Sequence, residues 1–239
     1  MNLIIDIGNT RTKIAVFDGD NRVRSLISEY NNINSNIKKL VKEYPIKNVI
    51  NASVSNTLLD LDLNKFDTYV ELNYQTKVPF INKYKTPKTL GVDRIALASA
   101  AAYQYPKKNV LIIDAGTCIT YDFINAKNEY LGGAISPGIN IRYKSLNEFT
   151  ANLPLLKQAD YELIGNDTES SIHSGVLNGF IQEIDGVIEQ YNRKYSNLTV
   201  VLTGGDTNFL AKKLKSSIFA TPNFLLEGLN SILIYNLDE

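Results

Sequence analysis

Two short segments of the chain place an acidic residue at the end of an apolar run and a glycine two positions later. Residues Asp6–Thr10 read Asp-Ile-Gly-Asn-Thr, residues Asp114–Thr117 read Asp-Ala-Gly-Thr, and Leu-Ile-Ile precedes each of them. A carboxylate at the end of a buried strand can hold Mg²⁺ directly or through water, because hard cations prefer oxygen ligands. Glycine allows a tight turn whose amides and neighbouring hydroxyls can face phosphate oxygens. The two segments therefore predict the binding of a nucleotide.

The residues after the first turn suit the same ligand. Arg11 and Lys13 can place positive charge next to phosphate, and the hydroxyl of Thr12 can donate a hydrogen bond. The alternative is a plain hairpin in which Asp and Thr side chains bind turn amides. Because the pattern occurs twice, each time between two predicted strands, we expect a nucleotide site. A further segment, Thr203–Asp206, follows an apolar strand, so its amides could also meet the nucleotide, or it could be a simple strand–helix connection.

A third acidic residue, Asp93, follows Gly91 and Val92 and precedes Arg94 and an Ala-rich segment. We expect a helix from about residue 91 to residue 103, with Asp93 in its first turn, where the positive helix end favours the ionised carboxylate. A carboxylate within hydrogen-bond reach of an alcohol can accept its proton during phosphoryl transfer. On the residues alone, a helix-capping acid is the alternative.

Each acidic turn must be positioned by a strand before it and a second strand after it. A third strand, helices and further strands follow each of these hairpins in the predicted order. This repetition predicts an α/β protein of two tandem domains, residues 1–106 and 107–239. The expected elements after the first hairpin are strands at 23–28, 48–52 and 68–72 and helices at 33–44 and 91–103. Those after the second are strands at 129–131, 198–203 and 218–220, helices at 140–148, 170–195 and 208–214, a turn or loop at Gly132–Gly138, and a closing helix opened by Pro222.

Composition excludes several classes of protein. The 239 residues are 44% hydrophobic and carry 25 basic and 25 acidic side chains, so a buried core is expected and a basic nucleic-acid surface is not. The single cysteine, Cys118, excludes an internal disulfide framework and a Cys-based zinc site. The first residues lack a signal-peptide pattern, and no apolar run approaches the length of a membrane span. We expect a cytoplasmic protein that binds neither nucleic acid nor membrane.

The two turns and Thr203–Asp206 resemble those of the actin and sugar kinase ATPase superfamily. Four further motifs narrow this likeness, and together they are similar to the type III pantothenate kinase family over about residues 3–235. These motifs are Tyr84–Arg94, Asp114–Asp122, Gly132–Gly138 and Gly165–Thr168. The resemblance implies two ribonuclease-H-like domains, each with a mixed sheet that has three antiparallel strands, flanked by helices.

The resemblance also implies the roles of particular residues. Asp93 would be the catalytic residue, accepting the proton of the pantothenate 4′-hydroxyl, and Asp6 would orient Mg²⁺ through the phosphates or through water. Asp114 would belong to a site for a monovalent cation, K⁺ or NH₄⁺. The ATP contacts would come from Asp6, Ile7, Gly8, Asn9, Thr10, Arg11, Thr12, Lys13 and Thr117. The pantothenate contacts would come from Tyr84, Gly91, Val92, Asp93, Arg94 and Thr168.

The activity implied is transfer of the γ-phosphoryl group of ATP to pantothenate, the first step of coenzyme A biosynthesis, by a homodimer. The alternative is a regulatory or accessory protein that keeps the fold and binds nucleotide without catalysis. Asp6, Asp93, Asp114 and Thr117 speak against that alternative, because a non-catalytic scaffold need not keep three separated acids.

Overall fold

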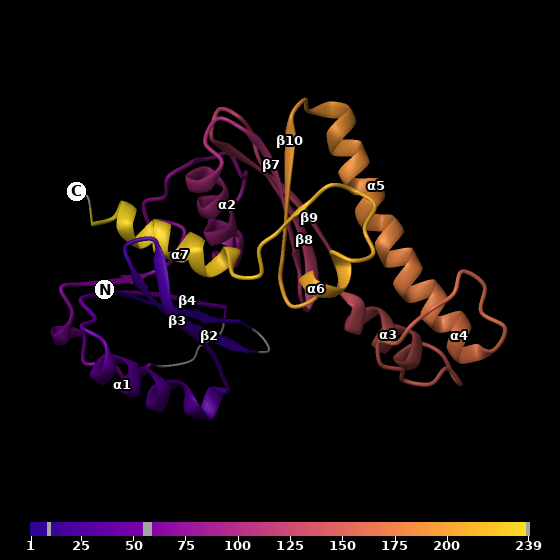
Figure 1. Ribbon diagram of the computed structural model, residues 1–239, viewed down its shortest axis with the longest axis horizontal. Helices are drawn as coiled ribbons and strands as arrows, with labels where there is room; N and C mark the ends of the chain where they lie inside the picture. Colours follow the sequence, from indigo (N-terminus) through magenta and orange to yellow (C-terminus); the bar gives the residue numbers. More distant parts are fainter. Residues whose placement is uncertain (9–10, 55–58, 238–239) are drawn as a thin grey trace. The chain divides into compact units, whose positions relative to one another are not determined.

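The computed structural model describes residues 1–8, 11–54 and 59–237. Contacts divide the chain into two compact units (Figure 1). Unit 1 comprises residues 1–107, 126–131 and 223–239, and unit 2 comprises residues 108–125 and 132–222. The division into domains at 106/107 stays a prediction, and the contacts group the closing residues 223–239 with unit 1.

The sheet of unit 1 has five strands in the order β3-β2-β1-β4-β5. Strand β1 pairs antiparallel with β2 and parallel with β4, β2 pairs antiparallel with β3, and β4 pairs parallel with β5. All six residues of β1 are buried, which explains why this central strand reads as a continuous apolar run up to Asp6. The bounds are β1 Asn2–Ile7, β2 Thr12–Asp18, β3 Asn21–Ser28, β4 Asn48–Ser53 and β5 Thr68–Glu71.

Helices cover both faces of this sheet (Figure 1). Helix α1, Ile33–Glu43, buries Ile33, Ile37 and Leu40 on one stripe against the side chains of β1 and β2. Helices α2, Val92–Gln104, and α7, Phe224–Tyr235, pack on one another and on β4. Their backbones approach so closely that a Cβ at Gly228 would lie 2.0 Å from the carbonyl oxygen of Ala96, which explains the glycine at this position.

The second sheet repeats the arrangement of the first. Its order is β11-β10-β7-β8-β9-β6, in which β7 pairs antiparallel with β8 and parallel with β10, and β10 pairs parallel with β11. The first five strands correspond to the order of the unit 1 sheet, and β6 is an addition that the sequence analysis missed. The bounds are β6 Ile81–Asn82, β7 Asn109–Ala115, β8 Cys118–Ile124, β9 Glu129–Pro137, β10 Leu198–Thr203 and β11 Phe219–Ala220. The predicted α/β class with two ribonuclease-H-like sheets is confirmed.

The interpretation of Gly132–Gly138 as a turn or loop was wrong, because β9 continues to Pro137. The glycines of this segment allow close backbone approach within the sheet. A Cβ at Gly133 would lie 1.6 Å from the carbonyl oxygen of Tyr121 in the neighbouring strand β8. Strand pairing at this distance thus requires glycine, whereas in a sequence the same glycines are typical of a turn.

Helices of unit 2 pack on one face of its strands. Helix α5, Gly179–Lys194, lies beside β10 (Figure 1), and its buried face joins residues of α3, Ile139–Glu148, in one apolar core. The predicted long helix at 170–195 is divided here, because a π-helical turn at Ser174–Asn178 separates α5 from α4, Thr168–His173. Helix α6 is short, Thr207–Leu210. Short 3₁₀ turns occur at Tyr30–Asn32, Leu63–Lys65 and Pro87–Thr89.

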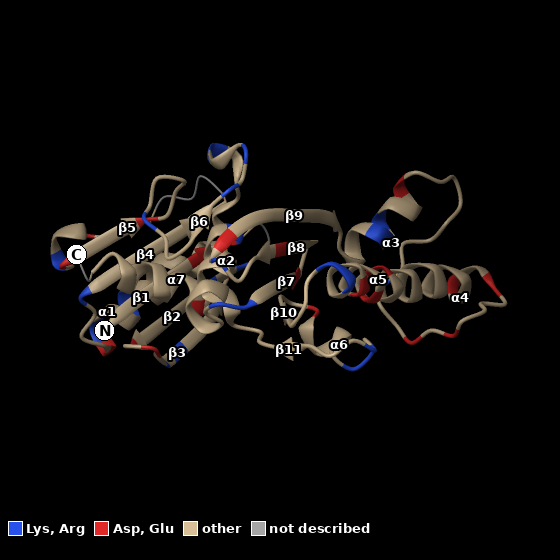
Figure 2. Ribbon diagram, turned by 90° about the horizontal axis from the view of Figure 1, so that it is seen from above, with Lys and Arg blue, Asp and Glu red and all other residues tan. Residues whose placement is uncertain are grey.

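Charged residues are spread over both units. In Figure 2 the described Lys and Arg residues lie on many elements of either unit, interspersed with Asp and Glu. No helix within residues 1–8, 11–54 and 59–237 is both long enough and apolar enough to cross a bilayer.

Candidate functional site

Asp6 lies where the first predicted phosphate-binding turn begins. It occupies the penultimate position of β1, opposite Lys13 of β2 and Ala52 of β4, and is 9% exposed. The turn is closed by a hydrogen bond from the amide of Gly8 to the carbonyl of Arg11 at 3.1 Å. A Cβ at Gly8 would also lie 3.1 Å from that oxygen, so the turn is tight enough to favour glycine. Asn9 and Thr10, both predicted to bind ATP, lie outside the described residues.

The other residues of the first predicted group differ in accessibility. Arg11 is exposed and Lys13 is half-buried, so both side chains can reach a ligand. Ile7 and Thr12 are fully buried, and the Thr12 hydroxyl has no hydrogen-bond partner within the described part of the chain. Within this group the described side chains of Arg11 and Lys13 are thus the more accessible ones, and their contact with phosphate stays a prediction.

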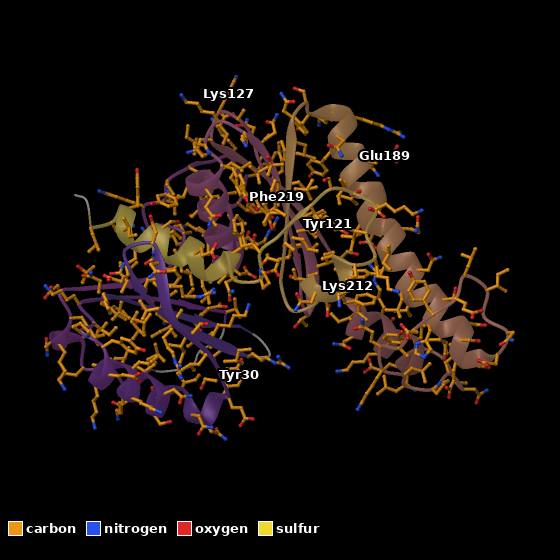
Figure 3. All side chains as sticks on the ribbon, viewed as in Figure 1. Tyr30, Tyr121, Lys127, Glu189, Lys212 and Phe219 are labelled. Carbon is orange, nitrogen blue, oxygen red and sulfur yellow. The ribbon has the colours of Figure 1, made fainter. Side chains whose placement is uncertain are left out.

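Tyr30 supports the first turn from outside it. Its hydroxyl donates a hydrogen bond to the carbonyl oxygen of Gly8 (Tyr30 is labelled in Figure 3). The residue follows β3, 22 positions after Gly8, and its ring is partly exposed. The sequence analysis missed it, because a lone tyrosine at this distance carries no local pattern.

Asp114 and Thr117 lie at the second predicted turn, in unit 2. Asp114 is half-buried near the end of β7, opposite Thr120 of β8 and Thr203 of β10. The amide of Gly116 donates to the carbonyl of Cys118 at 2.9 Å and closes the turn. Thr117 is exposed, so its hydroxyl is accessible to a ligand.

The segment Thr203–Asp206 packs directly on this second turn. Gly204 has a φ of +95°, and a Cβ there would lie 2.3 Å from the carbonyl oxygen of Ala115 and 2.4 Å from Oδ1 of Asp114. The amide of Asp206 donates to the same carbonyl oxygen at 3.0 Å. Burial raises the pKa of the Asp206 carboxyl above its usual range. Glycine is thus required at position 204 both for its backbone angle and for this approach to the acid.

The start of α3 contacts the second turn from another side. The amide of Gly138 donates to the carbonyl of Thr117 at 3.2 Å. A Cβ at Gly138 would lie 2.3 Å from the carbonyl oxygen of Gly116 and 2.5 Å from that of Thr117. The segment predicted as a loop therefore does touch the second turn, but as the end of a strand and a helix N-cap.

Asp93 lies in the first turn of α2, as predicted. Its Oδ1 accepts a hydrogen bond from the amide of Arg94 at 2.8 Å, so the carboxylate faces the positive helix end. A Cβ at the N-cap residue Gly91 would lie 2.3 Å from the same oxygen. Glycine here leaves room for the carboxylate to fold back over the helix start, and Val92 is half-buried beside it.

Arg94 and Tyr84 meet next to Asp93. Arg94 is 6% exposed, and its guanidinium carbon is 5.6 Å from the centre of the Tyr84 ring. The Tyr84 ring in turn lies 6.2 Å from that of Tyr130. Unit 1 therefore brings together all the predicted pantothenate contacts except Thr168.

Thr168 is the first residue of α4 in unit 2. Thr168 is exposed. The preceding residue, Asp167, caps the helix by accepting a hydrogen bond from the Ser170 amide at 2.8 Å. This hydrogen bond holds the pKa of the Asp167 carboxyl below its usual range. Thr168 lines a cavity of about 930 Å³, whose other walls include Arg142, Leu146, Leu153 and Ile172. The cavity is large enough for a small organic molecule.

The predicted convergence of the site residues requires the two units to act together. Asp6 and Asp93 belong to unit 1, and Asp114, Thr117 and Thr168 belong to unit 2. Their meeting around one nucleotide stays a prediction. Among the described residues, no group of three or more His, Cys, Asp or Glu could hold a metal ion. One carboxylate at a predicted phosphate-binding turn fits Mg²⁺ held mainly by nucleotide phosphates, as is usual for this ion.

Comparison with known proteins gives a consistent result. A family model described as type III pantothenate kinase matches residues 2–190. Proteins named type III pantothenate kinase from Flavobacterium johnsoniae and Christiangramia forsetii are 47% and 50% identical to this chain. The first alignment covers 100% of both chains and the second covers 99% of both.

Solved structures share the fold at lower identity. A crystal structure of a conserved putative Baf family transcriptional activator from Campylobacter jejuni has a TM-score of 0.63 at 22% identity, covering 99% of this chain and 100% of that one. A putative N-acetylmannosamine kinase from Listeria monocytogenes has a TM-score of 0.57 at 12% identity, covering 99% of each. At such identities the likeness concerns the fold alone.

Proposed function

The chain belongs to the type III pantothenate kinase family, and from this premise we propose which residues carry its reaction. It is an ATP-dependent kinase, and its substrate is pantothenate, so that the γ-phosphoryl group passes to the 4′-hydroxyl in the first step of coenzyme A biosynthesis. The observation that carries this function is the full-length likeness to proteins of that name. Nothing in the comparisons favours the non-catalytic alternative, since the likeness to a putative transcriptional activator is one of fold.

Asp93 is the proposed proton acceptor. As the hydroxyl oxygen bonds to the γ-phosphorus, the bond from that phosphorus to the β,γ-bridging oxygen breaks, ADP leaves, and the hydroxyl proton passes to the Asp93 carboxylate. The helix end and the Arg94 amide hold this carboxylate in one orientation. Such a reaction depends mainly on the alignment of acceptor and phosphate.

The two glycine turns are proposed to hold the triphosphate. Gly8, Arg11 and Lys13 would contact phosphate oxygens in unit 1, together with the predicted contacts Asn9 and Thr10; Thr117 would do so in unit 2. Mg²⁺ bound to the phosphates near Asp6 would neutralise charge that develops on them. Asp114, with the carbonyl of Ala115 close by, offers the oxygen ligands that K⁺ or NH₄⁺ would need.

Arg94 and Tyr84 are proposed to bind pantothenate. The guanidinium suits the pantothenate carboxylate through two parallel donors, and the ring of Tyr84 limits where it can lie. Thr168 would complete this site.

We also propose a homodimer, supported by large apolar side chains of unit 2 that are exposed in a single chain: Phe149 is 84%, Leu163 74% and Ile164 80% exposed. The cytoplasmic location stays a prediction.

The test is ADP release by the purified protein, with pantothenate as sole acceptor and with K⁺, NH₄⁺ or Na⁺ present. We expect turnover that requires pantothenate and is faster with K⁺ or NH₄⁺ than with Na⁺. Asp93→Asn should lower kcat by about a hundredfold or more, because general-base catalysis contributes on that order. Asp62→Asn, which changes a largely exposed acid of unit 1, is the matched control and should leave kcat unchanged.

Three results would contradict parts of this proposal. ADP release that ignores pantothenate, or that responds equally to a panel of hexoses, would exclude the substrate. An Asp93→Asn protein with wild-type kcat would exclude Asp93 as the base. An Asp114→Asn protein whose rate depends on K⁺ as strongly as the wild type would exclude Asp114 from the cation site.

A further inference from the structure

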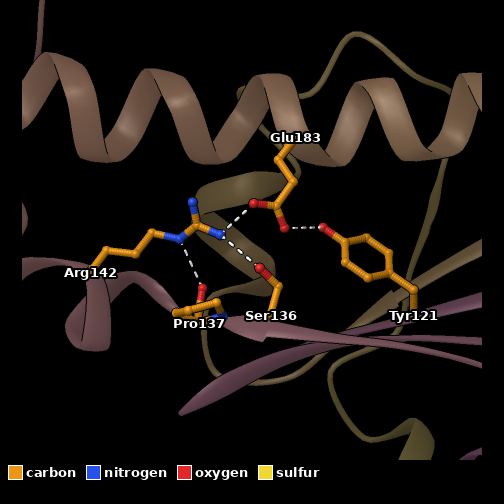
Figure 4. Close-up of polar contacts among 5 residues, drawn as sticks. All are labelled: Tyr121, Ser136, Pro137, Arg142 and Glu183. Carbon is orange, nitrogen blue, oxygen red and sulfur yellow. Dashed lines mark hydrogen bonds and ion pairs between the residues drawn. The ribbon is translucent and has the colours of Figure 1, made fainter. Parts of the chain in front are cut away.

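Arg142 of α3 lies at the centre of a polar network in unit 2 (Figure 4). Its Nε donates to the carbonyl of Pro137 at 2.8 Å, and its Nη2 donates to Oγ of Ser136 at 3.1 Å. The same Nη2 forms an ion pair with Oε2 of Glu183 on α5. One guanidinium thereby connects the end of β9 to the N-terminal half of α5.

Glu183 extends the network to a third element. Its Oε1 accepts a hydrogen bond from the hydroxyl of Tyr121 on β8 at 3.1 Å (Figure 4). Burial, and after it the charge of Glu183, raises the pKa of the Tyr121 hydroxyl above its ordinary value, so the hydrogen bond to Glu183 favours the protonated form. The carboxylate therefore bridges an arginine from one side and a tyrosine from the other.

Both ends of this network reach the second phosphate-binding turn. Pro137 is followed by Gly138, whose amide donates to the carbonyl of Thr117. Tyr121 belongs to β8, the strand that leaves the same turn at Cys118. Arg142 and Glu183 thus connect the end of β9, which leads into Gly138, to β8, the strand that follows the turn.

The environment makes the ion pair a stiff connection. The side chains of Arg142 and Glu183 are 22% and 28% exposed, and the guanidinium carbon lies 4.8 Å from the centre of the Phe180 ring. Partial burial weakens the screening by water and salt that makes exposed pairs worth little. By contrast, the pair Arg193–Glu189 further along α5 is exposed, with Glu189 at the outer side of the helix (Figure 3).

We propose that Arg142 and Glu183 are positioning residues for the nucleotide: they hold the Gly116–Thr117 turn in place through Pro137–Gly138 on one side and Tyr121 on the other. This inference rests on the proposed ATP contact at Thr117. Neither residue touches the nucleotide in this mechanism. A lysine at position 142 would keep the charge, but its single ammonium group cannot reproduce the fork that joins Glu183, Ser136 and Pro137.

The experiment measures ATP and pantothenate kinetics for Arg142→Lys and Glu183→Gln. Arg142→Lys should raise KM for ATP about tenfold, within the range found for residues that act on a site without touching its ligand. Its kcat at saturating ATP and its KM for pantothenate should stay within about twofold of the wild-type values. Glu183→Gln should have a smaller effect in the same direction, and the double variant should be no worse than Arg142→Lys. The matched controls Arg193→Lys and Glu189→Gln should change neither KM.

A second readout separates this inference from the proposed function. The rise in Tm produced by Mg·ATP without pantothenate should be smaller for Arg142→Lys than for the wild type. If the wild type shows this rise but no pantothenate-dependent turnover, the proposed substrate is wrong. The difference in Tm rise between Arg142→Lys and the wild type then still tests the positioning role. A folded Arg142→Lys protein with wild-type KM for ATP and wild-type Tm rise would overturn the inference. A change confined to KM for pantothenate would overturn it too, because Arg142 would then act on the substrate through the adjacent cavity.

Discussion

Gly138→Ala should damage the second phosphate turn by steric contact alone. Gly138 has φ −72° and ψ 174°, which alanine adopts without strain. Its Cβ would nevertheless lie 2.3 Å from the carbonyl oxygen of Gly116, 2.5 Å from that of Thr117 and 3.0 Å from the carbonyl carbon of Thr117. All three atoms are backbone, so no flexible side chain can move aside, and the turn or the start of α3 must shift by about 1 Å to restore ordinary contact.

The size of the effect follows from that shift. A misplacement of about 1 Å can cost about a hundredfold in rate, so kcat/KM for ATP should fall by about that factor. Overpacking of this kind costs about 1–3 kcal/mol of unfolding free energy. At about 2–4 °C per kcal/mol for a chain of this size, Tm should fall by several degrees. Most of the protein should remain folded at assay temperature, so the kinetic loss is measurable.

The assay is pantothenate-dependent ADP release at varied ATP, together with thermal unfolding. Gly186→Ala is the matched control: it lies inside α5, a Cβ there meets no described atom within 4 Å, and it should raise Tm slightly without changing kinetics. The reasoning would be refuted if Gly138→Ala kept wild-type kcat/KM for ATP and wild-type Tm. It would also be refuted if Gly186→Ala caused the same loss.

Three further changes test other parts of the site. Gly91→Ala places a Cβ 2.3 Å from Oδ1 of Asp93, so the Asp93 carboxylate must rotate away. We therefore expect kcat to fall about tenfold or more, with little change in Tm. An unchanged kcat would contradict this prediction. Tyr30→Phe removes the hydroxyl that donates to the Gly8 carbonyl and should raise KM for ATP about threefold to tenfold, the effect expected from the loss of one hydrogen bond. Steady-state kinetics test this prediction, with Tyr74→Phe at an exposed position as the control. Asp206→Asn tests a pH dependence: the raised pKa means that protonation stabilises the fold, so this stability is present below the ordinary aspartate pKa and lost as pH rises through the raised value. Asp206→Asn should therefore raise Tm at pH 7 more than at pH 4, and an equal change at both would count against it.

The positions of the three candidate aspartates in the fold were predictable because their signals are local. Asp6 and Asp114 follow apolar runs that become buried central strands, and Asp93 precedes an Ala-rich helix. The alternation of strands and helices along the chain was also predictable, because apolar runs bounded by turn residues are local signals, whereas the short strand β6 at the edge of the second sheet was missed. The segment Gly132–Gly138 failed for the opposite reason: glycine is typical of turns, and only the neighbouring backbone of Tyr121 shows that it belongs to a strand.

By itself the sequence determined the class of fold, the family and the places of the three aspartates, since apolar periodicity and residue type act over a few positions along the chain. The tertiary structure alone decided what holds those places: Tyr30 on Gly8, Gly138 on Thr117, and Arg142 with Glu183 between two strands and a helix. These contacts join residues far apart in the chain, and they depend on distances between backbone atoms and on the direction of single side chains. Distances between backbone atoms and directions of single side chains leave no periodic pattern in the sequence, so these contacts are known only from the tertiary structure.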